Sequence, residues 1–319
     1  MTDNRTFILN DIEDNFEENG NIKRTFKLPG IIGFTMTDHT VEMHIPKDAI
    51  SRNMQDDSAA FEGWALVLKR WGNVDKVVIS WDRHNLVKDG HYQRFLFRVN
   101  NFLRDFGSWF SIAPDSLIYL EDLRIKNTGT YFLNSPAKNR KESESQRTES
   151  KYEIKFTSDI FWGKDLKNAS NAKFLGRQLP VGVFEGDIKK VNSIFTGGKS
   201  AIDIWGINHD DELLLFELKA EKNNKIGIIS ELYFYYCIMR CVQTGQFKHK
   251  KSETDLERIA NTKKIKAYFL APKLHPLIDQ PLMNELNAAM APNIEFLYLQ
   301  FEERSDKMTL QNGFNPVIP

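Results

Sequence analysis

The chain has 319 residues, of which 41% are hydrophobic and 27% are charged, a composition typical of a globular protein with its own apolar core. The 43 basic and 43 acidic side chains cancel, so the net charge neither supports nor excludes a nucleic-acid partner, which responds to local basic surface. The N-terminal sequence is acidic and polar, unlike a signal peptide. No apolar run approaches the roughly 20 residues that cross a bilayer. We therefore expect a cytoplasmic protein that does not enter the membrane.

The N-terminal half combines short strands with amphipathic helices, which predicts an α+β domain over residues 1–136. The predicted strands are Gly33–Met36, Val41–Ile45, Lys76–Ser80 and Ser116–Leu120. The predicted helices are Phe61–Trp71 and Tyr92–Phe106, and the second keeps one apolar face at the period of 3.6 residues. Arg94 and Arg98 lie outside that apolar face, so we interpret both as solvated or as contacts to a nucleic-acid backbone.

Residues 137–151, with the sequence AKNRKESESQRTESK, predict a linker between two domains. The segment contains Lys, Glu and Ser but no large apolar side chain, so it has nothing with which to cover a core. Residues 152–319 would then form the second domain.

The C-terminal half predicts an α/β domain, a mixed sheet flanked by helices. The predicted strands are Val191–Phe195, Ser200–Ile207, Glu212–Ala220, Lys264–Ala271 and Asn293–Phe301. A helix over Ile228–Val242 follows the third strand, and a helix over Leu282–Met290 separates the last two. Cys237 and Cys241 fall one helical turn apart, without further ligands at zinc-site spacing, so we expect two buried free thiols.

Three charged residues interrupt the apolar strands of this second domain. In the strand after Glu212, alternation places Leu215, Glu217 and Lys219 on one face. Asp203 is the lone acid of the preceding strand. If these strands form a hairpin, the midpoint of positions 203 and 217 is 210, inside the turn. The sequence therefore predicts that Asp203 and Glu217 lie nearly opposite each other.

Two carboxylates and an ammonium group in one place suit the chemistry of phosphoryl groups. Mg²⁺ prefers oxygen ligands and keeps water and substrate phosphate in its shell, and Mn²⁺ is able to substitute for it. Such a metal lowers the pKa of bound water and offsets transition-state charge, while Lys219 could orient the water or neutralise a phosphate oxygen. The alternative is a structural ion pair at the edge of a sheet.

The spacing of Asp203, Glu217 and Lys219 resembles that of the PD-(D/E)XK nuclease superfamily. The resemblance covers roughly residues 174–270 and implies a restriction-endonuclease-like fold for the C-terminal half only. A helix that follows the third strand often carries a Gln-x-x-x-Tyr motif in this superfamily, and here Glu231 and Tyr235 have that spacing. An acid on an earlier helix is also typical, for which Glu185 is our candidate metal ligand. Tyr235 could instead be an ordinary core residue.

The resemblance implies a Mg²⁺-dependent endonuclease that hydrolyses DNA in prokaryotic defence or repair. Asp203, Glu217 and Glu185 would bind the metal, and Lys219, Glu231 and Tyr235 would assist catalysis. Nucleases of this fold often work as dimers, so a homodimer is expected. The residues before the linker would form a recognition, regulatory or assembly module. Two alternatives stay open: a catalytically silent nucleic-acid-binding module of the same fold, and a nuclease directed at RNA, because the active-site chemistry is the same for both polymers.

Overall fold

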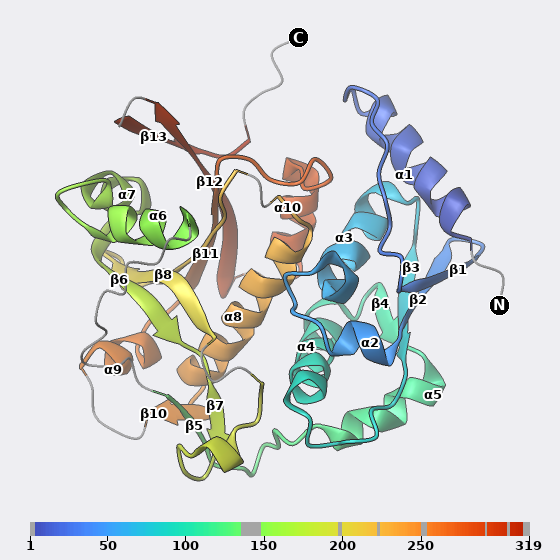
Figure 1. Ribbon diagram of the computed structural model, residues 1–319, viewed down its shortest axis with the longest axis horizontal. Coiled ribbons are helices and arrows are strands. Elements are labelled where there is room, and N and C mark those ends of the chain that lie inside the picture. The colour runs from blue at the N-terminus through green and yellow to red at the C-terminus, as the bar shows by residue number, and fades with distance from the viewer. Residues whose placement is uncertain are drawn as a thin grey trace. The chain divides into compact units, whose positions relative to one another are not determined.

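A computed structural model of the chain describes residues 4–134, 148–196, 200–221, 224–249, 254–290, 292–304 and 307–314. The chain forms two compact units, each with its own sheet (Figure 1). Unit 1 consists of Met1–Lys126, Lys225–Glu231 and His275–Ala289. Unit 2 consists of Asn127–Asn224, Leu232–Leu274 and Met290–Pro319. Both units combine helices with mixed sheets, so the predicted α/β class is confirmed.

A four-stranded sheet in the order β1-β2-β3-β4 forms the centre of unit 1. Its strands are β1 (Gly33–Thr37), β2 (Thr40–Ile45), β3 (Lys76–Trp81) and β4 (Phe110–Ile112). Its helices are α1 (Arg5–Glu18), α2 (Lys47–Ile50), η1 (Asp57–Ala59), α3 (Phe61–Trp71), α4 (Gly90–Phe106), α5 (Pro114–Leu117), η2 (Ile118–Asp122) and α10 (Gln280–Ala288). Strand β1 is antiparallel to β2, whereas β2, β3 and β4 are parallel. Helices α3 and α4 make the connections between these parallel strands, so helices and strands alternate here.

The predicted helices of unit 1 are confirmed, and one predicted strand is wrong. Helix α4 begins after Asp89, whose carboxylate accepts hydrogen bonds from two backbone N–H groups of the first turn, a standard N-terminal cap. The predicted strand Ser116–Leu120 is instead the end of α5 and most of η2. Pro114 explains the difference, because its fixed φ angle favours the first turn of a helix.

Unit 1 also contains a buried ion pair between helices α3 and α4. Glu62 is 0% and Arg98 is 3% exposed. The Arg98 guanidinium donates to both carboxylate oxygens of Glu62 and to the carbonyl of Ala59, the last at 2.9 Å. Arg94 is buried as well and donates to the carbonyl of Arg52 at 3.2 Å. The interpretation of these two arginines as solvated or nucleic-acid-binding side chains is therefore wrong.

A six-stranded sheet in the order β13-β12-β11-β9-β8-β6 forms the centre of unit 2. Its strands are β6 (Ala172–Pro180), β8 (Ala201–Asn208), β9 (Leu213–Leu218), β11 (Ile265–Ala271), β12 (Ile294–Arg304) and β13 (Lys307–Asn312). Strands β6, β8 and β9 form an antiparallel meander, β9, β11 and β12 are parallel, and β13 is antiparallel to β12. A second sheet contains β10 (Phe247–His249), β5 (Tyr131–Leu133) and β7 (Val183–Glu185).

Helices cover both faces of the six-stranded sheet. On one face, α6 (Thr148–Thr157) and α7 (Gly163–Ser170) contribute side chains such as Phe156 to a core with Ile204 and Phe216 of the strands (Figure 1). On the other face, α8 (Gly227–Gln243) packs its Tyr236 ring 6.1 Å from that of Phe296. Burial on both faces explains why β9 reads as a nearly unbroken apolar run.

The predictions for unit 2 fail at one strand and at the edge of the linker. Residues predicted as the strand Val191–Phe195 contain the end of η3 (Lys190–Asn192) and a single bridge at Ser193, and Val191 is 87% exposed, so no buried face supports a strand. Residues 135–147, most of the predicted linker, lie outside the described part. The last four linker residues already belong to α6. The division into a recognition domain and a nuclease domain stays a prediction.

Cys237 and Cys241 are both buried free thiols, as predicted. Among the described residues, none of the helices has the length and apolar character that a membrane span requires.

Candidate active site

The hairpin of β8 and β9 has the register that the sequence predicted. Ile204 pairs with Phe216 and Trp205 pairs with Leu215, so each pair of numbers is centred on position 210. Asn208 builds the turn, because its side-chain oxygen accepts hydrogen bonds from the N–H groups of Asp210 and Glu212 at 3.0 and 2.8 Å. Such Asx geometry makes a tight connection between antiparallel strands and holds the two strands in this register.

Asp203 lies one residue before the first ladder pair of β8 and is half-buried. Its Oδ2 accepts a hydrogen bond from the backbone N–H of Leu218 at 3.1 Å. The carboxylate is thus held at the end of β9, beside Glu217. Asp203 alternates with Ile204, and Glu217 alternates with Phe216, which both face the core under α6 and α7. Strand alternation therefore places the two acids on the opposite face.

Glu217 and Lys219 form an ion pair at the end of β9 that is almost completely removed from solvent. Glu217 is 1% and Lys219 is 4% exposed, and the Lys219 ammonium donates to Oε1 of Glu217. The backbone N–H of Lys219 also donates to the carbonyl of Leu270 on β11 at 3.0 Å. Desolvation of two charges costs several kcal/mol for each ion. Charged side chains are therefore expected here only where they form an ion pair or have a functional role.

Glu149 is a further acid at this end of β9, and the sequence analysis missed it. It lies in the first turn of α6, and its Oε1 accepts from the backbone N–H of Ala220 at 3.3 Å. Ala220 directly follows Lys219. The sequence predicts Glu149 as part of the linker because its neighbours are polar. The signal that could have found it is the pair Tyr152 and Phe156, whose spacing of four residues marks an apolar helix face starting there.

Glu185 lies elsewhere in unit 2. It is an exposed residue of β7 and pairs with Tyr131 in the three-stranded sheet, whereas Asp203 and Glu217 belong to the six-stranded sheet. The structure therefore does not place this predicted metal ligand on the sheet that carries the other two. A strand of only three residues left no clear periodicity in the sequence, which is why its environment was not predictable.

Glu231 and Tyr235 are one turn apart on α8, as the spacing predicts, and both are 3% exposed. The Glu231 carboxylate accepts from the side-chain amide of Gln55 at 2.5 Å within unit 1. The Tyr235 ring lies 5.9 Å from that of Phe234. Both side chains therefore have contacts typical of a packed interior. Their assistance in catalysis stays a prediction.

The acids at the end of β9 fit a magnesium ion by their chemistry. Among the described residues, no group of three or more acidic, histidine or cysteine side chains is arranged to hold a metal ion. Mg²⁺ nevertheless requires only one or two protein carboxylates, because water and substrate phosphates complete its octahedral shell. Asp203 and Glu217 supply those two hard oxygen donors from one face of the sheet.

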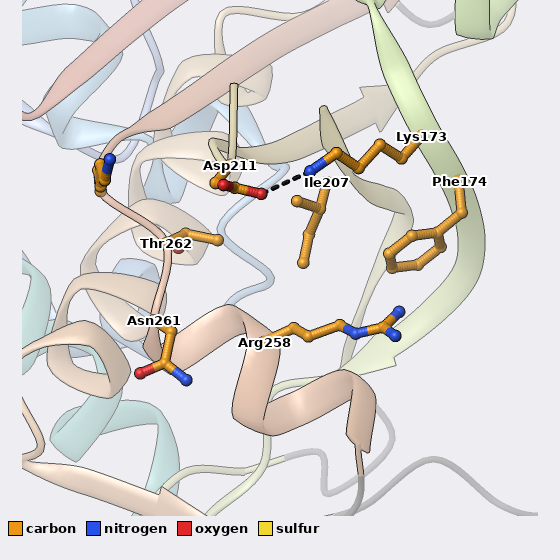
Figure 2. Close-up of a pocket in the computed structure, with 8 residues that line it drawn as sticks. Lys173, Phe174, Ile207, Asp211, Arg258, Asn261 and Thr262 are labelled. Atoms are coloured by element: carbon orange, nitrogen blue, oxygen red, sulfur yellow. Dashed lines mark hydrogen bonds and ion pairs between the residues drawn. The ribbon is translucent and has the colours of Figure 1, made fainter. Parts of the chain in front are cut away.

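A basic pocket of about 570 Å³ opens at the other end of β9, beside the hairpin turn (Figure 2). Its lining residues are Lys173, Phe174, Ile207, Asp211, Arg258, Asn261, Thr262 and Lys263. The Lys173 ammonium pairs with Asp211 at 2.6 Å. Figure 2 shows Arg258 extending across the pocket from α9 (Thr254–Ala260). Three cations against one anion make this a positively charged site, which suits phosphate groups.

No family model matches the chain, and searches of curated proteins and of solved structures likewise find no match. The functional argument therefore rests on the geometry of the chain itself.

Proposed function

We propose that unit 2 is a PD-(D/E)XK nuclease with a restriction-endonuclease-like core and hydrolyses phosphodiester bonds of DNA. The observation that carries the proposal is the hairpin register centred on position 210, which holds Asp203 beside Glu217. The order of elements also supports it. Asp203 lies on the second and Glu217 on the third strand of the meander β6-β8-β9, and helix α8 follows, as the resemblance implies.

In this proposal, Asp203 and Glu217 hold Mg²⁺ or Mn²⁺, and Glu149 is the further metal ligand in place of Glu185. The bound metal would lower the pKa of a water molecule and offset charge on the phosphate. Lys219 orients the attacking water and donates a hydrogen bond to the phosphate oxygen. The burial of Lys219 strengthens both interactions, because charge acts more strongly where water is excluded.

The basic pocket on the same unit supports a nucleic-acid substrate. The six residues of β9 separate the pocket from Lys219. At a rise of about 3.3 Å per residue, this separation is about 20 Å. A duplex that enters the active site is longer than this distance, so in this proposal its backbone also contacts Arg258 and Lys263. Two copies of the chain would be needed to cut both strands at once, which makes a homodimer part of the proposal. A role in prokaryotic defence or repair belongs to it as well.

The test is hydrolysis of supercoiled plasmid DNA by the purified full chain with Mg²⁺ or Mn²⁺. We expect nicking that a chelator stops and that Lys219→Ala lowers by at least about a hundredfold, the range of a lost general acid–base or charge-stabilising group. Lys189→Ala, an exposed lysine of the same unit, is the matched control and should keep full activity.

Three other outcomes would each redirect the proposal. Equal activity of Lys219→Ala and the parent protein would refute the assignment of the site. Nucleic-acid binding with no cleavage and no metal uptake by calorimetry would favour the silent binding module. Cleavage of RNA in preference to a DNA of the same sequence would change the substrate and leave the site in place.

A further inference from the structure

Polar side chains gather on one face of the unit 1 sheet. Along β2, Val41 and Met43 are buried, whereas Glu42 and His44 between and beside them are accessible. Ser80 of β3 is the register partner of His44, so the two side chains lie on the same face. The alternation therefore separates an apolar face from a face that carries an acid, an imidazole and a hydroxyl group.

These side chains form a continuous hydrogen-bonded chain. The Ser80 hydroxyl donates to Oε1 of Glu42 at 2.6 Å, and Nδ1 of His44 lies 3.1 Å from the same hydroxyl. On the other side of the ring, Nε2 of His44 lies 3.4 Å from the Asp82 carboxylate. The Ser80 hydroxyl donates to Glu42, and Ser80 is only 9% exposed. This arrangement holds the Glu42 carboxylate in place and does not present the Ser80 hydroxyl as a nucleophile.

A pocket of about 510 Å³ lies over this part of the sheet, within the size range of small-molecule sites. Glu42, His44 and Ser80 line it from the strands. The turn of helix beyond β4 adds Asp115 and Tyr119, and Figure 1 shows α5 beside this sheet. The walls thus come from two parts of unit 1, the strands and the helical turns that follow β4.

The lining of the pocket is rich in acceptors and negatively charged. Glu42 and Asp115 are its acids, and none of the described residues that line it is Lys or Arg. Arg83 lies near Tyr119, with its guanidinium 5.4 Å from the ring centre. That guanidinium is already paired with both carboxylate oxygens of Asp122, at 2.9 and 2.7 Å, so Asp122 neutralises its charge outside the pocket.

Among the described residues that line the pocket, its acids therefore meet no lysine or arginine. We propose that it binds a small organic cation with a primary ammonium or guanidinium group. Glu42 and Asp115 meet the charge, since ionised acceptors make the strongest hydrogen bonds to such donors. The Tyr119 and Trp81 side chains that also line the pocket would contact the apolar stem of the ligand.

Gly33 widens the site at its floor. It pairs with His44 across β1 and β2, and a Cβ atom at Gly33 would approach the His44 Cβ to 3.3 Å. A side chain there would press on the residue that connects Ser80 to Asp82. Gly33→Val is therefore expected to reduce binding through the shape of the pocket, without any change in its charge.

The experiment is calorimetric titration of the full chain with butylguanidinium, butylammonium and butylurea, which is the neutral counterpart of the first. We expect saturable binding of one or both cations and none of butylurea. Glu42→Gln and Asp115→Asn should each weaken binding at least about tenfold, whereas Glu121→Gln, an exposed acid of η2 outside the pocket, should leave it unchanged. The glutamine variant keeps an acceptor for Ser80, so the sheet should stay folded.

A short acetylated peptide with one central arginine tests whether the ligand is a free small molecule or the side chain of a partner protein. Tighter binding of the peptide than of butylguanidinium would assign the ligand to a partner, and similar binding would assign it to a free small molecule. Three results would overturn the proposal: no binding of either cation at millimolar concentration, equal binding of butylurea, or equal binding by Glu42→Gln. None of these results bears on nuclease activity.

Discussion

The two units each bury an ion pair, and the two pairs differ in how completely the protein satisfies them. In unit 1, Arg98 makes a two-point contact with Glu62 and a third contact with a backbone carbonyl, between two helices. In unit 2, Glu217 and Lys219 are neighbours on one strand end. Arginine suits the first role because its planar group donates in several directions, whereas a lysine is a compact point charge on a flexible stem.

The comparison shows that burial of charge alone does not indicate function. Both pairs are almost fully removed from solvent, and both carry the cost of desolvation. The pair in unit 2 differs because a second carboxylate, Asp203, is held at the same strand end, and because Glu149 of α6 accepts from the backbone of Ala220 beside it. The further acids held at the same strand end, and not burial alone, are what make the site a candidate for chemistry.

The largest expected effect concerns the pair in unit 1. Arg98→Ala leaves the Glu62 carboxylate buried without its guanidinium, which should lower the free energy of unfolding by about 3–5 kcal/mol. Urea unfolding followed by circular dichroism measures the change. The double variant Arg98→Met with Glu62→Leu should recover most of the loss, because well-packed apolar side chains often replace a buried pair at little cost. A loss below about 1 kcal/mol in the single variant would show that the pair contributes little.

The next effect separates chemistry from stability in unit 2. Asp203→Asn keeps an oxygen that can accept from the Leu218 N–H, so the free energy of unfolding should change by less than about 1 kcal/mol. Loss of the negative charge should nevertheless lower DNA hydrolysis at least about a hundredfold, equivalent to about 2.7 kcal/mol. Plasmid nicking and urea unfolding on the same preparation measure both quantities. A variant that is unstable and inactive in equal measure would make Asp203 a structural residue like Glu62.

The smallest effect concerns the exposed cations of the basic pocket in unit 2. Lys263→Gln and Arg258→Gln should each reduce the slope of log K against log salt for DNA binding by about one, the expectation for one lost phosphate contact. Fluorescence anisotropy over a salt series measures the slope, and Lys189→Gln provides the control outside the pocket. Cleavage of a small chromogenic phosphodiester should stay unchanged in both variants. An unaltered slope would remove this pocket from the substrate path.

Local patterns in the sequence predicted most of the elements that position the candidate site. The strands that became β8, β9 and β11 and the helix that became α8 were predicted within about two residues, because each buries a regular face. The register of the hairpin was predicted as well, since a tight turn between antiparallel strands leaves few alternatives. The face shared by Glu217 and Lys219 follows from the alternation of side chains along one strand.

Tertiary structure alone decided which charged groups meet. Arg98 reads as a surface residue of an amphipathic helix until α3 covers it, and Glu149 reads as part of a polar linker until α6 brings it to the end of β9. Glu231 meets Gln55, and Glu42 of the unit 1 pocket meets Ser80, across long stretches of chain. Periodicity reports which face of an element is apolar, but a partner distant in sequence leaves no trace in that pattern. The chain therefore determined by itself where Asp203, Glu217 and Lys219 lie, and only the fold decided what surrounds them.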